Sequence, residues 1–234
     1  MSDITIAIDG FSSTGKSTVA RQLAAALAYI YVDTGAMYRA VTLYALRSGF
    51  ISGETIDSKG LIGHLRKLEL EFRHNADTGR SDMYLNGENV EEEIRRLEVS
   101  RMVSQVSVLP EVREKLVALQ REMGKNKGLV MDGRDIGTVV FPDAELKIFM
   151  TASPDTRAAR RYKELLDKGE KVQYEEVLEN VRKRDHIDAN RAVSPLKKAE
   201  DAVVVDNSDM GLDEQFERLL FLSRQIIEKN KKSG

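Results

Sequence analysis

Residues able to bind phosphate lie close to the start of the chain, where positions 10 to 17 match the pattern G-x-x-x-x-G-K-[ST]. In this pattern the glycines let backbone N–H groups turn toward an anion, and the following helix adds the positive end of its dipole. Lys16 is then placed to reach the β- and γ-phosphates of a bound nucleotide, and the Ser17 hydroxyl to bind Mg²⁺. The alternative, a simple glycine turn between a strand and a helix, seldom has Lys-Ser in this register. We therefore expect the ATP-binding residues to be Gly10, Phe11, Ser12, Ser13, Thr14, Gly15, Lys16, Ser17 and Thr18.

The segments on both sides of this loop have the periodicity that the pattern requires. Residues 5–9 form a short apolar run typical of a strand. After the loop, Val19, Leu23, Ala26 and Leu27 recur at helical spacing. The order strand, loop, helix is the context in which this pattern binds phosphate.

A second group of chemically useful residues follows a strand predicted at residues 129–131. The strand leads into Asp132-Gly133-Arg134-Asp135, which places two carboxylates and an arginine within four residues. In open parallel sheets, ligands bind at the carboxyl ends of the strands. We therefore favour a role in ligand binding for this segment.

Further arginines occur at Arg39 and between residues 157 and 191. Taken alone, Arg39 would be a solvated surface residue, and charge runs are usually solvated helix faces. Arginine, however, binds phosphate bidentately and stabilises the charge of a transferring phosphoryl group. Two arginine-bearing helices around the polar turn 168–171 therefore predict a mobile lid, and the separate arginines imply two phosphate-bearing substrates. The arginines of the predicted lid are Arg157, Arg160, Arg161, Arg182, Arg184 and Arg191.

Strands that alternate with helices predict an α/β fold with a parallel, doubly wound sheet. A helix should begin after Ser153, a good N-cap followed by Pro154. Between about residues 50 and 95, short alternating strands and the hairpin signal Asn86-Gly87 predict an inserted β element, after which Pro110 separates two helices. Strands are expected at residues 29–32 (ending in Asp33-Thr34-Gly35), 68–73, 83–85, 129–131, 146–150 and 202–206, and a closing helix at 212–227.

The composition limits the classes of protein to which the chain can belong. The 234 residues are 41% hydrophobic and 32% charged with a formal net charge of −2, so we expect a globular core and no general surface for nucleic acid or membrane. Cysteine is absent, which excludes disulfides and fits a reducing compartment. The sequence shows no targeting segment and no apolar run near the roughly 18 residues of a membrane span, so we expect a cytoplasmic protein.

The phosphate-binding pattern alone does not choose among switch GTPases, motor ATPases and small-molecule kinases. The guanine signature N-K-x-D is missing, because Asn126-Lys127 is followed by Gly-Leu. After Asp132 the chain has Gly-Arg, where many ATPases would have an acidic residue to orient water. The arginines favour a kinase for a phosphorylated acceptor. A kinase for UMP, dTMP or shikimate is an alternative, and a nucleotide-dependent switch protein is another.

Three segments, residues 33–39, 132–143 and 184–192, resemble those of bacterial cytidylate kinases, and the similarity extends over almost the whole chain. The resemblance implies transfer of the γ-phosphoryl group of ATP to CMP or dCMP with Mg²⁺, in a protein that we expect to be a monomer. It also implies three regions. Residues 1–35, 128–153 and 192–234 would form the P-loop core, 36–127 an NMP-binding subdomain with the β insert, and 154–191 the lid.

The resemblance further assigns roles by matched position. Catalysis would involve Lys16, Arg134, Arg157 and Arg161, of which the last two lie at the ATP side. Within the CMP site, Thr34 would lie near the sugar, Arg39 and Arg134 would hold the phosphate, and Ser104 and Arg113 would contact cytosine. The remaining CMP-binding residues, whose individual contacts the resemblance leaves open, would be Asp135, Arg184 and Arg191.

Two positions depart from the family pattern. Phe11 stands where the family commonly has proline, which affects the stiffness of the loop more than its chemistry. Thr34 stands where the family usually has serine, and it keeps the hydroxyl but adds a methyl group. The choice between ribose and deoxyribose acceptors is therefore left open.

Overall fold

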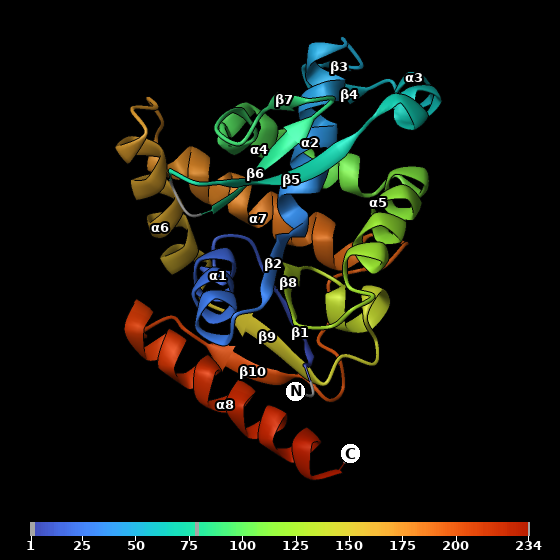
Figure 1. The fold of residues 1–234 in the computed structure, drawn as a ribbon. Coiled ribbons are helices and arrows are strands. Elements are labelled where there is room, and N and C mark those ends of the chain that lie inside the picture. Colours follow the sequence, from blue (N-terminus) through green and yellow to red (C-terminus); the bar gives the residue numbers. More distant parts are fainter. Residues whose placement is uncertain (1–2, 78–79, 234) are drawn as a thin grey trace. The chain divides into compact units, whose positions relative to one another are not determined.

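A computed structural model describes residues 3–77 and 80–233 of the chain (Figure 1). The chain forms two compact units. The first contains the residues up to Asp33 and those from Gln120 onward, and the second is Thr34–Leu119. The residues of the predicted lid, 154–191, lie in the first unit.

A five-stranded parallel sheet forms the centre of the first unit, with the strand order β10-β9-β1-β8-β2. The central strands β1 and β8 are buried along their whole length, as expected for a parallel sheet covered on both faces. The register pairs Asp9 with Gly133 and Asp33 with Asp132, so polar residues meet at the carboxyl ends of three neighbouring strands. The strands are β1 (Thr5–Gly10), β2 (Ile30–Asp33), β8 (Leu129–Gly133), β9 (Leu146–Thr151) and β10 (Val203–Asp206).

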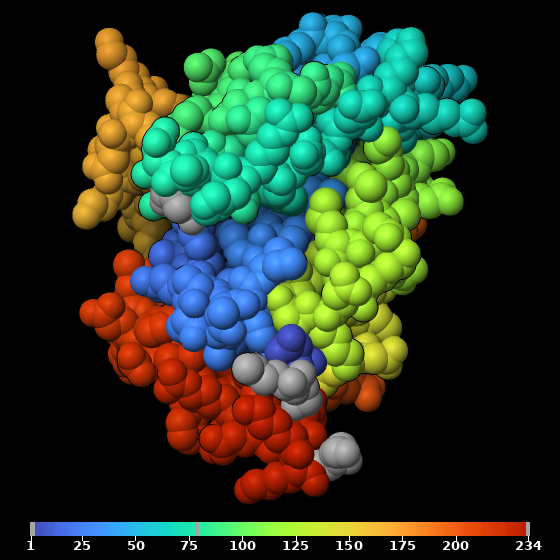
Figure 2. Space-filling model, viewed as in Figure 1, coloured from blue at the N-terminus to red at the C-terminus, as the bar shows by residue number. Residues whose placement is uncertain are grey.

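Helices pack against this sheet through apolar faces. Leu23 of α1 and Leu219 of α8 lie in the same buried cluster as Ile6, Ile148 and Met150 of the strands. Figure 2 shows the blue atoms of the N-terminal segment beside the red atoms of α8. None of the described helices is both long and apolar enough to cross a bilayer. The helices that lie wholly in the first unit are α1 (Lys16–Leu27), the π-helix η3 (Ile136–Val140), α6 (Pro154–Asp167), α7 (Tyr174–Asn190) and α8 (Leu212–Ser233).

The second unit packs helices against short antiparallel strands. Its sheets have the orders β3-β4 and β5-β6-β7. Asn86 and Gly87 join β6 to β7 with φ values of 50° and 83°, as the Asn-Gly hairpin signal predicts. The elements are α2 (Thr34–Arg47), β3 (Ile51–Ser52), β4 (Thr55–Ile56), α3 (Ser58–His64), η1 (Leu65–Lys67), β5 (Leu70–Asn75), β6 (Arg80–Leu85), β7 (Glu88–Asn89), η2 (Glu93–Arg95), α4 (Leu97–Ser107) and α5 (Pro110–Met123), whose last residues belong to the first unit.

Most local predictions agree with this structure, although several boundaries differ: the strand expected at 68–73 is β5 (Leu70–Asn75), and the closing helix expected at 212–227 extends to Ser233. The parallel α/β sheet is confirmed, and Ser153 caps α6 by accepting a hydrogen bond from the Thr156 amide, with Pro154 at the first helical position. Thr34 and Gly35 were expected to end the second strand. They are instead the first two residues of α2, which begins directly after Asp33.

Candidate active site

The loop between β1 and α1 has the conformation of a phosphate-binding loop. Gly10 and Gly15 have φ values of 146° and 86°, in a region that favours glycine. A Cβ on Gly10 would lie 2.0 Å from the Met150 carbonyl oxygen, so no other residue fits there without moving β9. Gly15 is the N-cap of α1 and brings no side-chain cap to the helix, so the N-terminus of α1 is suited to an anion.

Lys16 is folded into this loop and is only 5% exposed. Its Nζ donates to the Phe11 carbonyl oxygen at 2.5 Å and to Thr14 Oγ1 at 3.3 Å. Burial lowers the pKa of Lys16 well below its usual value, and the nearby charge of Arg134 lowers it further. The ammonium group is thus held inside the loop, where it could contact a bound phosphate.

Two hydrogen bonds meet on the carboxylate of Asp132 at the end of β8. Ser17 Oγ donates to Oδ2 at 3.0 Å, and the Tyr31 hydroxyl donates to Oδ1 at 2.7 Å. Burial, and after it the charge of Asp33, raise the pKa of Asp132 to about 6. A hydroxyl and a carboxylate side by side are hard oxygen donors of the kind that Mg²⁺ prefers. These residues therefore fit a Mg²⁺ ion bound together with nucleotide phosphates.

Arginine and aspartate side chains form ion pairs between the segment that follows β8 and the C-terminal end of α7. Arg134 Nε donates to Asp188 Oδ2 at 2.8 Å, and Arg191 Nη2 lies 3.6 Å from Asp135 Oδ1. Burial works against the charge of Asp188, yet Arg134, Arg184 and Arg191 hold its pKa below the usual value. The structure thus brings together four of the predicted CMP-binding residues, namely Arg134, Asp135, Arg184 and Arg191.

Arg157 of α6 contacts the phosphate-binding loop. Its Nη1 is 3.4 Å from the Ser12 carbonyl oxygen, and its guanidinium lies 5.1 Å from the centre of the Phe11 ring. Two further hydrogen bonds, at 2.8 and 2.6 Å, join it to Asp185 of α7. Arg161, one turn further along α6, pairs with Glu164 at 2.8 Å instead.

The predicted cytosine contacts lie together in the second unit. Ser104 and Arg113 are each 2% exposed. Arg113 Nη1 donates to the Ser107 carbonyl oxygen at 3.4 Å, and Ser107 Oγ donates to the Ser104 carbonyl oxygen at 2.8 Å. The Arg113 guanidinium also lies 5.6 Å from the centre of the Tyr38 ring on α2. On the same helix, Thr34 is buried in the first turn and Arg39 is half-buried.

Comparison with known proteins places this arrangement in a family. The family model for cytidylate kinase matches residues 6–225, which is nearly the whole chain. The chain belongs to the cytidylate kinase family. The resemblance seen in the sequence is thereby confirmed.

Curated relatives agree over nearly full length. A cytidylate kinase of Flavobacterium johnsoniae is 59% identical over 227 residues, which is 97% of this chain and 99% of the relative. A cytidylate kinase of Parabacteroides distasonis is 61% identical over 215 residues, 92% of this chain and 94% of the relative. A gluconokinase from Sinorhizobium meliloti has a TM-score of 0.51, 12% identity and coverage of 99% and 98% of the two chains, and this likeness concerns the fold alone.

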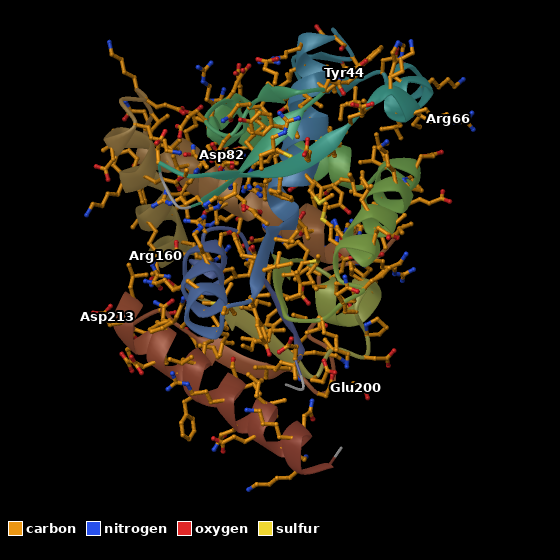
Figure 3. All side chains as sticks on the ribbon, viewed as in Figure 1. Tyr44, Arg66, Asp82, Arg160, Glu200 and Asp213 are labelled. Atoms are coloured by element: carbon orange, nitrogen blue, oxygen red, sulfur yellow. The ribbon has the colours of Figure 1, made fainter. Side chains whose placement is uncertain are left out.

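In this member of the cytidylate kinase family, a buried amide that sequence reasoning missed supports the phosphate-binding loop. Asn207 Nδ2 donates to the Thr14 carbonyl oxygen at 2.6 Å and to Gln215 Oε1 at 2.7 Å. Asn207 Oδ1 and its carbonyl oxygen accept hydrogen bonds from Arg160 at 3.1 and 2.8 Å. Arg160 is labelled on α6 in Figure 3. The sequence feature that could have indicated Asn207 is its position directly after β10, at the carboxyl end of the sheet, where ligands bind in such folds.

Four other polar residues of the site also escaped the sequence analysis as site residues. Each makes a hydrogen bond to a residue far away along the chain, and two of the four lie within the family-like segment 184–192. They are Asp9, Tyr31, Asp185 and Asp188.

Proposed function

We propose that this protein transfers the γ-phosphoryl group of ATP to CMP or dCMP, which gives CDP or dCDP and ADP. The observation that carries the proposal is the arrangement at the carboxyl ends of β1 and β8. There a phosphate-binding loop that contains Lys16 adjoins the cluster of Arg134 with Asp188. Membership of the cytidylate kinase family supports the choice of acceptor.

The donor side would use residues 10–18 for the phosphates of ATP. Backbone N–H groups of the loop and the first turn of α1 would face the β- and γ-phosphates. The Ser12 hydroxyl is buried and makes no hydrogen bond to any described residue, as expected of a group that donates to a phosphate oxygen when nucleotide is bound. Ser17 and Asp132 would hold Mg²⁺, which when bound offsets the negative charge of the phosphates.

On the acceptor side, Arg39 and Arg134 would bind the phosphate of CMP. Arg184, Arg191 and Asp135 would complete this site, and Thr34 would lie near the sugar. A phosphate oxygen of CMP then attacks the γ-phosphorus of ATP in line with the leaving ADP. Such a transfer needs positioning and charge neutralisation, without a covalent enzyme intermediate.

Base recognition would fall to Ser104 and Arg113. Cytosine presents O2 and N3 as acceptors, whereas uracil presents N3–H as a donor. Since arginine can only donate, Arg113 would pair with cytosine and would face an unsatisfied donor in uracil. Its nearly complete burial makes an unpaired group costly.

The helices α6 and α7, with the turn between them, would close over the bound nucleotides as a lid. Closure would exclude water, which could otherwise receive the phosphoryl group. Arg157 and Arg161 would act at the ATP side, and the contact of Arg157 with the Ser12 carbonyl oxygen supports this for Arg157. We retain residues 1–35, 128–153 and 192–234 as the core, 36–127 as the NMP-binding subdomain and 154–191 as the lid.

We further propose that the protein acts as a monomer in the cytoplasm on small nucleotides, without a nucleic acid or membrane partner. The net charge of −2 supports the absence of a nucleic-acid partner, because a general nucleic-acid surface would be strongly basic.

A coupled assay for ADP with a panel of acceptors tests the proposed function. CMP, dCMP, UMP, dTMP and shikimate would each be added with ATP and Mg²⁺, beside a sample with no acceptor. We expect turnover with CMP or dCMP to exceed that with the others by at least about tenfold. Faster turnover with another acceptor would make the protein a different kinase. ATP hydrolysis that needs no acceptor would favour the nucleotide-dependent switch.

A further inference from the structure

Asp9, the residue before Gly10, accepts two hydrogen bonds that no sequence pattern predicts. It lies on β1 and is 5% exposed. Its Oδ1 accepts a hydrogen bond from the Ile136 amide and its Oδ2 one from the Gly137 amide, each at 2.8 Å. One carboxylate therefore holds two consecutive backbone N–H groups that lie 127 and 128 residues away along the chain.

These two amides begin the π-helix η3. The first N–H groups of a helix have no partner inside it, and π-helices are rare elements that are frequently found at functional sites. Here Asp9 supplies the missing acceptors. The fit is close, because a Cβ on Gly137 would lie 3.1 Å from Lys147 Cδ and 3.4 Å from Asp9 Oδ2. The carboxylate thus holds the start of η3 in one place.

The two amides directly follow Arg134 and Asp135, which join β8 to η3. Asp9 is also paired with Gly133 in the sheet register. The segment 133–137 is therefore fixed at its start by the β1–β8 ladder and at its end by the Asp9 carboxylate.

We propose that Asp9 is a positioning residue for the acceptor phosphate, because its carboxylate fixes the turn that presents Arg134 and Asp135. Asp9 also precedes the phosphate-binding loop, so one residue sets the donor loop and the acceptor turn relative to each other. The inference rests on the proposed function, in which Arg134 and Asp135 face CMP.

The charges around Asp9 allow this role. Burial raises its pKa to about 6, the bonds from Gly137 and Ile136 lower it, Asp135 raises it and Lys16 lowers it. Lys147, whose side chain lies beside Gly137, pairs through Nζ with Asp201 at 2.9 Å. At neutral pH Asp9 is ionised and can accept both hydrogen bonds. An asparagine could accept only one, and its NH₂ group would face the second N–H.

The test replaces Asp9 by Asn in the full-length protein and compares both substrates. We expect Asp9→Asn to raise KM and the calorimetric Kd for CMP by about 5- to 30-fold, since a buried N–H is left without its acceptor. KM for ATP should stay within about twofold. Asp9→Glu keeps both oxygens and should retain part of the affinity for CMP. It also serves as the test if the asparagine variant does not fold.

A matched control comes from the other end of the same strand, where Glu145 Oε2 accepts a hydrogen bond from the Thr5 amide at 2.9 Å. Glu145→Gln should change neither KM by more than about twofold. Unchanged CMP binding in Asp9→Asn, or an equal loss for both nucleotides, would overturn the inference while the wild-type activity stands. A wild-type protein that does not phosphorylate CMP would instead overturn the proposed function.

Discussion

Arg157 of α6 and Asp185 of α7 form a bidentate ion pair, with Nη1 to Oδ1 at 2.8 Å and Nη2 to Oδ2 at 2.6 Å. The same guanidinium contacts the Ser12 carbonyl oxygen and the Phe11 ring. This pair therefore connects both helices of the proposed lid to the phosphate-binding loop. The buried Arg157 guanidinium lies over the ring of Phe11, so this residue, which replaces the proline common in the family, makes a specific cation–π contact.

Asp185→Asn should destabilise the protein, because the buried Arg157 then loses its counter-charge. Asp185 is partly exposed, so we expect a loss of about 1 to 3 kcal/mol and a fall in Tm of about 2 to 12 °C, measured by calorimetry. Glu164→Gln, which removes the more exposed pair with Arg161, should cost less than about 0.5 kcal/mol. Equal losses in the two variants would show that the Arg157 pair does not stabilise the lid.

Lys16→Ala should act on catalysis rather than on acceptor binding. The ammonium group is fixed inside the phosphate-binding loop, so its removal withdraws a preorganised charge from the transferring phosphoryl group. We expect kcat to fall by about 10²- to 10³-fold. The calorimetric Kd for CMP should stay within about twofold, as it should for the exposed-turn control Lys168→Ala. A near-normal kcat with weakened CMP binding would refute the role given to Lys16.

The buried carboxylates of Asp9 and Asp132, each with a pKa of about 6, should make stability depend on pH. A carboxylate whose pKa is raised on folding binds more protons in the folded state than in the unfolded state between about pH 4 and 6. The unfolding free energy of the ligand-free protein should therefore fall as pH rises through this window. Groups with lowered pKa, such as Asp188, act in the opposite direction but at lower pH.

Urea denaturation at pH 5 and pH 7 measures this effect. The wild type should be more stable at pH 5 by about 1 to 3 kcal/mol, and Asp132→Asn should reduce the difference. Activity should show the opposite pH dependence, because Asp132 in its proposed role as a Mg²⁺ ligand must be deprotonated. Wild-type kcat/KM for ATP should therefore decline below about pH 6. An Asp132→Asn protein with the full wild-type pH dependence of stability would contradict the assignment.

Arg113→Ala tests how the base is chosen. If the buried guanidinium reads the acceptor edge of cytosine, its loss should lower kcat/KM for CMP far more than for UMP, and the ratio of the two should narrow about 5- to 150-fold. Both substrates would be measured on both proteins over a range of concentrations. A ratio that does not change would mean that Arg113 serves only to pack against Tyr38 and the end of α4.

Local features of this protein could be predicted from the sequence because their causes are local. The spacing of Gly10, Gly15 and Lys16 specifies the phosphate-binding loop, and Ser153 with Pro154 specifies the start of α6. The Asn86-Gly87 turn follows from the low cost of positive φ at these residues. The family resemblance supplied what spacing alone could not, namely the acceptor.

The long-range hydrogen bonds of the site could not be predicted from local sequence patterns. The bond between Asp9 and Ile136 and the bond between Asn207 and Thr14 join residues more than a hundred positions apart. They exist because the parallel sheet places β1, β8 and β10 with their carboxyl ends at one edge. The π-helix η3 was missed for the same reason, since Asp9 rather than its own sequence pattern supplies the acceptors at its start.

The central claim is that the protein is a kinase for cytidine monophosphates, and a competition experiment tests it most directly. ATP with Mg²⁺ would be mixed with equal amounts of CMP and UMP, both well below saturation, and the nucleoside diphosphates separated by anion-exchange chromatography at early times. We predict CDP in excess over UDP by at least about tenfold, with one ADP formed for each diphosphate. Equal amounts of CDP and UDP, or ADP formed without either, would contradict the account.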